Sequence, residues 1–170
     1  MSEVRQVIVT NMINGNISIR KPHLGLNRQW QQFGQKMRIP FDILEEAMWD
    51  TGVKNLFTSG YLYIESLKDK IDLGLEPEGV TEPVNIINLD PKKMEEMWKN
   101  LPLDVFKVQF GKLTKVQADS LIEYAITNSI VDTAKCSWVK EVTKKDILKA
   151  ISTREDVAAA EKAEAAKRNH

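Results

Sequence analysis

The sequence has few of the residues on which reactive sites are usually built. Its 170 residues include one cysteine, Cys136, and two histidines, His23 and His170. One cysteine excludes an internal disulfide framework, and neither histidine has a cysteine or carboxylate at metal-ligand spacing. Motifs typical of phosphate-binding loops, dinucleotide sites, serine hydrolases and zinc proteases are also lacking. We therefore expect a chain that is not an enzyme and that uses no metal or cofactor.

Long apolar runs are lacking as well. No run approaches the roughly 18 residues of a membrane span, and the polar start MSEVRQ differs from a secretory signal. The lone cysteine favours folding in a reducing compartment. With 42% apolar residues the chain can form a packed core, as one domain or two small ones. We predict no membrane association.

The first forty residues carry the signals of β-structure. Residues 4–13 are rich in β-branched side chains, and Asn14-Gly15 is the dipeptide most typical of a two-residue hairpin. Such a hairpin predicts that Met12 pairs with Ile17. The chain from 24 to 39 continues as extended structure with two aromatic residues, Trp30 and Phe33. These side chains either pack in the core or, beside basic residues, form a stacking surface for single-stranded nucleic acid.

A short helix and a strand are predicted within residues 39–66. Asp42 precedes the apolar pattern of the helix, and Glu45 follows three residues later, the spacing of a capping box. Gly52 and Gly60 are expected to reverse the chain with positive φ. After Gly60 the apolar period changes to two, which predicts a strand.

The second half is predicted to be helical. Asp90-Pro91 is a helix start with proline at the first helical position, and Thr114 with Gln117 matches a capping box. After Val157 the chain has high helix propensity but no large apolar side chain. It therefore predicts an exposed helix that frays, or a segment that orders against a partner.

These signals together predict an α+β fold. A small β-rich module, made of a hairpin, further strands and one short helix, precedes a bundle of short helices. We predict four parts: a β-rich module at 1–73, a linker at 74–89, a helical module at 90–152, and a flexible or partner-ordered tail at 153–170.

Charge is unevenly distributed along a chain whose formal net charge is zero. Residues 1–40 contain six basic side chains and one acidic, a net charge of +5, whereas residues 41–100 contain six basic and thirteen acidic, a net charge of −7. Such a division suits an oriented electrostatic contact between copies or with a charged partner, and it equally suits an ordinary solvated surface. As partner-binding residues we predict a basic set, with Trp30 in the core: Arg20, Lys21, Arg28 and Arg38.

Three stretches carry a resemblance to a known class of proteins. They are VIVTNMINGN at 7–16, MRIPF at 37–41 and GVKNLFTSGYLYI at 52–64. In this order they resemble small accessory virion proteins of tailed bacteriophages, which attach to head or neck assemblies. The resemblance covers about a third of the chain and leaves the C-terminal helices unexplained.

The resemblance implies a structural role in assembly. It implies docking on capsid, portal, neck or tail proteins, and a location in the virion after assembly in the host cytoplasm. An alternative is a nucleic-acid-binding regulator, based on the basic first forty residues and on the lysines of TKKDILKAI at 143–151. The near-neutral total charge disfavours this alternative.

Overall fold

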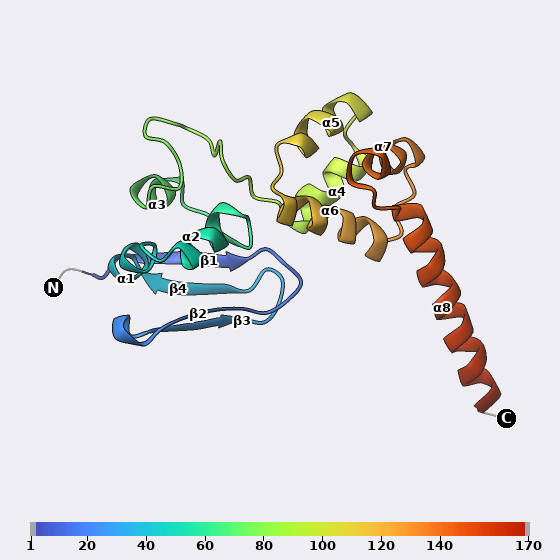
Figure 1. The fold of residues 1–170 in the computed structure, drawn as a ribbon, viewed down its shortest axis with the longest axis horizontal. Helices are drawn as coiled ribbons and strands as arrows, with labels where there is room; N and C mark the ends of the chain where they lie inside the picture. Colours follow the sequence, from blue (N-terminus) through green and yellow to red (C-terminus); the bar gives the residue numbers. More distant parts are fainter. Residues whose placement is uncertain (1–2, 169–170) are drawn as a thin grey trace. The chain divides into compact units, whose positions relative to one another are not determined.

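The computed structural model of the protein describes residues 3–168, which form two compact units. Unit 1 comprises residues up to 93 together with 112–120, and unit 2 comprises 94–111 together with the residues from 121 onward. Figure 1 shows the strands and helices of both units. In chain order these are β1 (Gln6–Asn11), β2 (Ile17–Lys21), a 3₁₀ turn (Pro22–Leu24), β3 (Leu26–Trp30), β4 (Lys36–Pro40), α1 (Phe41–Ala47), α2 (Thr51–Thr58), β5 (Leu62–Ile64), α3 (Leu67–Asp72), α4 (Pro91–Lys99), α5 (Leu103–Gly111), α6 (Lys115–Thr127), α7 (Thr133–Thr143) and α8 (Ile147–Arg168).

The protein is α+β, as predicted, with its strands in two small antiparallel sheets followed by helices. One sheet has the order β4-β1-β5, and the other pairs β2 with β3. In the central strand β1, Val7 and Val9 are buried, whereas Ile8, on the other face, is 37% exposed. Along β2, Ile17 and Ile19 are buried while Ser18 and Arg20 are exposed, so that one face of this strand contacts water, as predicted.

The predicted hairpin between β1 and β2 is wrong. Thr10 pairs with Lys36 of β4 and with Tyr63 of β5, so β1 has neighbours on both edges and offers none to β2. The Asn11 side chain directs the chain away from β1, because its Oδ1 accepts from Ile13 N at 3.1 Å and its Nδ2 donates to Gly15 O at 2.9 Å. A local Asx turn therefore replaces the two-residue hairpin.

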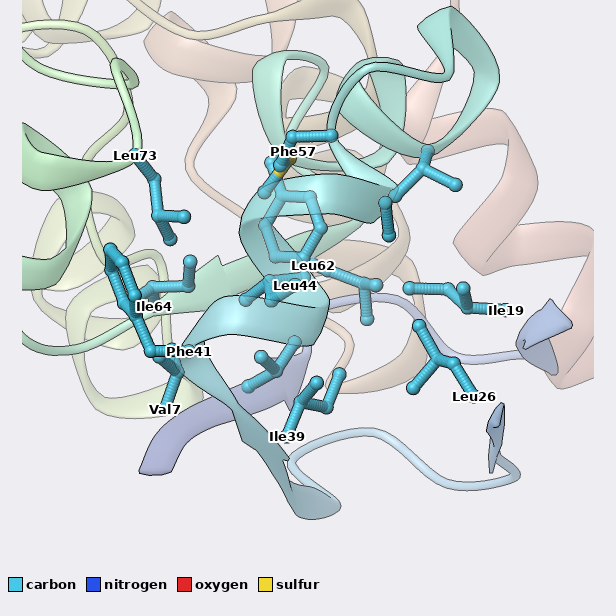
Figure 2. Packing of buried hydrophobic residues seen from close by; sticks show 14 of the residues in the cluster. Val7, Ile19, Leu26, Ile39, Phe41, Leu44, Phe57, Leu62, Ile64 and Leu73 are labelled. Carbon is cyan, nitrogen blue, oxygen red and sulfur yellow. The ribbon is translucent and has the colours of Figure 1, made fainter. Parts of the chain in front are cut away.

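Both sheets of unit 1 contribute to one hydrophobic core. The core combines Val7 and Ile39 from one sheet with Ile19 and Leu26 from the other, and α1 and α2 cover it with side chains that include Phe57. Figure 2 shows these side chains converging from strands and helices. A buried hydrogen bond from Trp30 Nε1 to Val9 O, 3.1 Å long, also joins the two sheets. The prediction that Trp30 belongs to the core is confirmed.

Two local predictions around α1 and α2 are wrong. Asp42 does not cap α1, because the helix begins at Phe41 and Pro40, two residues before Asp42, occupies the cap position without a side-chain bond. Asp50 instead caps α2, accepting from Gly52 N at 2.8 Å and Val53 N at 3.3 Å. Gly52 consequently lies within the helix and needs no positive φ.

Gly60, in contrast to Gly52, does adopt a positive φ, of +90°. A Cβ at this position would lie 2.9 Å from Cγ of Gln117, so the close approach also requires glycine. The predicted capping box beside it is confirmed: Gln117 N donates to Thr114 Oγ1 at 3.1 Å, and Thr114 N donates to Gln117 Oε1 at 3.3 Å. Thr114 Oγ1 further donates to Ser59 O at 2.6 Å, within unit 1.

Residues 74–90 have no helix or strand and belong to unit 1. They are held in place by the buried carboxylate of Glu76, which accepts from Val84 N and Asn85 N at 3.1 Å each. Asp90 then accepts from Lys93 N at 2.8 Å and starts α4 at Pro91, as predicted.

Unit 2 is built on an aromatic cluster. The ring centres of Trp98 and Phe106 are 4.9 Å apart, and Phe110 meets Trp138 edge to face at 5.3 Å. Trp98 Nε1 donates to Leu121 O at 3.0 Å, which satisfies the polar atom of a side chain that is only 1% exposed. These short helices depend on this packing, because helices of their length are marginal alone.

Candidate protein-interaction surface

Trp49 differs from the other three tryptophans of the chain in its exposure. Trp30 and Trp98 are buried and Trp138 is half-buried, whereas Trp49 is 86% exposed in the turn between α1 and α2. An indole carries one of the largest apolar areas of any side chain, and tryptophan is enriched at the energetic centres of protein interfaces. The structure therefore provides a candidate anchor for a partner.

The packing of α1 explains why this indole faces water. Phe41, Leu44 and Ala47 bury one side of the helix against the core of unit 1. Met48 extends that buried side, and the next residue in the turn therefore projects outward. The exposed side of the same segment is acidic. Asp42, Glu45 and Glu46 lie at helical spacing to the tryptophan, and Asp50 follows it directly in the turn.

A hollow of about 390 Å³ lies beside the indole, within unit 1. Its lining includes Lys21 and His23 from the end of β2 and the following turn, together with Glu46 and Asp50. Lys21 Nζ forms an ion pair with Asp50, and this contact, with the backbone amides of Val53 and Gly52, lowers the pKa of the Asp50 carboxyl. We call the following set the Trp49 surface: Lys21, His23, Leu24, Asp42, Glu45, Glu46, Trp49 and Asp50.

The four predicted contact residues do not form one patch. Arg20 lies on the exposed face of β2, opposite Asn27, and the next residue, Lys21, belongs to the Trp49 surface. Arg38 is exposed on β4, in the other sheet, opposite Ile8. Arg28 is half-buried on β3, and its Nε donates to Arg38 O at 3.1 Å. Arg28 therefore has a structural contact, which links a strand of one sheet to a strand of the other.

Much of the unequal charge is compensated inside unit 1. Arg5 pairs with Asp69 and Asp72, the second at 2.7 Å, which raises the pKa of its guanidinium. Lys36 pairs with Glu65 at 2.7 Å. Together with the Lys21 pair, these contacts join the basic segment to the acidic one. Within residues 3–168, the side chains of Arg20 and Arg38 have no such acidic partner.

The stacking surface for single-stranded nucleic acid, considered from the sequence at Trp30 and Phe33, is not available at Trp30. Trp30 is fully buried and donates to Val9 O, so its ring faces no solvent. Phe33 is half-buried. Trp49 is an exposed aromatic side chain of unit 1, but its carboxylate neighbours repel phosphate.

A second exposed element belongs to unit 2. Helix α8 is attached through Ile147 and Ile151, which are buried, and through Arg154, whose Nη1 donates to Thr127 O at 2.6 Å. Every described residue from 152 to 168 is exposed. The tail predicted at 153–170 thus forms a helix as far as Arg168, without a covering partner in the described part of unit 2.

Sequence reasoning missed Trp49, although a signal was present. When Leu44, Ala47 and Met48 form the buried side of a helix, the next residue lies about 140° from Leu44 and about 160° from Ala47 around the axis and therefore faces outward. A tryptophan at an outward position points to a binding surface, whereas one at an inward position is usually part of the core. The positions of the buried residues along the helix are therefore enough to identify Trp49 as an exposed tryptophan.

None of the helices in the described range is both long and apolar enough to cross a membrane. Comparisons with protein-family models, curated proteins and solved structures found no match to this chain.

Proposed function

We propose that this chain is a non-enzymatic interaction protein that docks on a larger protein assembly through the Trp49 surface. Its resemblance to accessory virion proteins of tailed bacteriophages leads us to propose a capsid, portal, neck or tail assembly as the partner. On this proposal the chain is made in the host cytoplasm and is found in the virion.

The exposure of Trp49 is the observation that carries the proposal. Burying an indole on a partner removes about 150 to 250 Å² from water, at about 25 cal/mol per Å². In the isolated chain almost all of this area remains in contact with water, because the side chain is 86% exposed. A binding partner gains from it without breaking any contact of the fold.

The neighbours of Trp49 define the chemistry of the partner. Asp42, Glu45 and Glu46 are exposed along the same side of α1. A complementary surface presents an apolar pocket for the indole with lysines or arginines at its rim. The same carboxylates disfavour nucleic acid at this surface, because they repel phosphate groups.

Sedimentation of material from the native source tests the proposal. At moderate salt the chain is expected to sediment with large particles, and a Trp49→Ala chain is expected in the fractions of free protein. The proposal fails if wild-type chain occurs only as a free monomer or small oligomer in a source that also contains such particles.

The alternative of nucleic-acid binding rests on Arg20 and Arg38, which are exposed and form no ion pair with an acidic side chain among the residues that the structure describes. Phosphate contacts make affinity fall steeply as salt rises. A titration of single- and double-stranded nucleic acid at low and moderate salt decides this alternative, which is rejected if no binding occurs even at low salt.

A further inference from the structure

Unit 1 contains a cavity, separate from the Trp49 surface, with a buried lysine in its lining. The cavity has a volume of about 290 Å³. Its apolar lining comes from α2, β5 and the loop that follows α3, through the side chains of Phe57, Leu62, Ile64, Leu75 and Ile86. This volume is close to the lower end of small-molecule sites, which are mostly apolar with a few polar groups.

Lys70 is the polar side chain that distinguishes this cavity. The residue is 3% exposed, and its Nζ donates one hydrogen bond, to Tyr63 Oη at 3.0 Å. The Nζ also lies 4.4 Å from the centre of the Tyr63 ring. An ammonium has three donors, and no described acceptor other than Tyr63 Oη is within hydrogen-bond distance of this one.

The nearest carboxylate of the lining does not satisfy the ammonium. Glu76 is 5% exposed and directs its oxygens to backbone amides, with Val84 N and Asn85 N at 3.1 Å and Ile86 N at 3.5 Å. No carboxylate within residues 3–168 forms an ion pair with Lys70. Burial accordingly lowers the pKa of Lys70, against the opposing effect of the Glu76 charge.

We propose that this cavity binds a small organic carboxylate, with the apolar body of the ligand against Phe57, Leu62 and Ile86 and its carboxylate on Lys70. A buried ammonium is costly unless it is paired, and a carboxylate supplies the missing acceptors together with the opposite charge. The apolar lining favours a short aliphatic or aromatic body. The site is independent of docking through Trp49.

Nuclear magnetic resonance titration of the full chain with butyrate, hexanoate, octanoate and benzoate tests the proposal. We expect saturable shifts of backbone amides around the cavity, including those of Tyr63, Lys70 and Asn85, for at least one of these acids below about 10 mM. The matching alcohol or benzamide is expected to bind at least tenfold more weakly. Lys70→Met removes the charge at similar length, and it is expected to abolish the preference for the acid.

Lys68→Met is the matched control, because Lys68 is exposed on the same short helix, α3. This variant is expected to bind as the wild type does. If Lys70→Met fails to fold, the proposal is tested on the wild type alone, by the positions of the amides whose resonances shift and by the difference in affinity between each acid and its uncharged analogue. The proposal is overturned if none of the four acids gives saturable shifts, if the uncharged analogues bind equally well, or if folded Lys70→Met retains the preference.

Discussion

Replacement of Trp49 by alanine separates folding from binding. The indole is 86% exposed, and no hydrogen bond of its side chain is found among the described residues. Surface changes away from special features usually alter the free energy of unfolding by less than about 0.5 kcal/mol. We therefore expect Trp49→Ala to unfold at the same urea concentration as the wild type.

Binding is expected to change much more. A buried indole gains about 4 kcal/mol by area, and ordering of the side chain reduces this, so truncation should cost about 2 to 4 kcal/mol. This corresponds to a dissociation constant about 30-fold to 1000-fold higher. The assay is a sedimentation titration of purified chain onto particles from the native source that have been depleted of it.

Two controls make the comparison specific. Val84→Ala changes another exposed apolar residue of unit 1 and should leave affinity unchanged. Trp98→Phe changes a buried indole that donates to Leu121 O, so it should lower the free energy of unfolding by about 1 to 3 kcal/mol. The reasoning is refuted if Trp49→Ala destabilises the fold by more than about 1 kcal/mol, or if it binds as tightly as the wild type.

Three further predictions concern stability. Arg28→Ala should lower the free energy of unfolding by about 0.5 to 1 kcal/mol, because it loses the bond to Arg38 O, whereas Arg38→Ala should change it by less; equal urea midpoints would contradict this. Truncation after Arg154 should reduce helical circular dichroism without lowering the unfolding midpoint, since residues 155–168 are exposed; a lower midpoint would mean that they pack. Burial raises the pKa of the Cys136 thiol, so on raising the pH the thiol loses its proton in the unfolded chain before it does in the folded chain. The free energy of unfolding of the wild type, relative to that of Cys136→Ala, should therefore fall as pH rises above about 9. A difference that stays constant with pH would contradict this.

Local signals in the sequence predicted several elements correctly. Asp90 starts α4 and Thr114 with Gln117 starts α6, because capping depends on residues three positions apart. The burial of Trp30 also followed from the general preference of aromatic side chains in strands for the core. These features are decided within a few residues, and therefore a single sequence contains enough information to find them.

Features that depend on distant pairing were not predictable in the same way. Asn14-Gly15 favours a hairpin locally, but β4 and β5 occupy both edges of β1, and the Asn11 side chain turns the chain away. Asp42 and Asp50 are equally good caps by composition, but Asp42 lies inside the first turn of α1, behind Pro40, whereas Asp50 lies directly before α2 and caps it. The ion pairs between the basic residues of 1–40 and the acidic residues of 41–100 likewise depend on the fold and could not be predicted from the sequence.

The cavity around Lys70 illustrates the same limit for the candidate sites. A lysine in the short helix α3 reads as an exposed residue, since lysine is rarely buried unless it is paired. The loop of residues 74–90 places Glu76 and Asn85 around it, through contacts that span about ten residues and have no motif. Only the folded chain shows that this side chain is withdrawn from water.

Oxidative footprinting of Trp49, read by mass spectrometry in free chain and in chain isolated with its particles, is the most direct test of docking by this surface. Docking predicts rapid oxidation of Trp49 in the free chain and strong protection in the particle, with buried Trp98 protected in both. Equal oxidation of Trp49 in the two samples would contradict it.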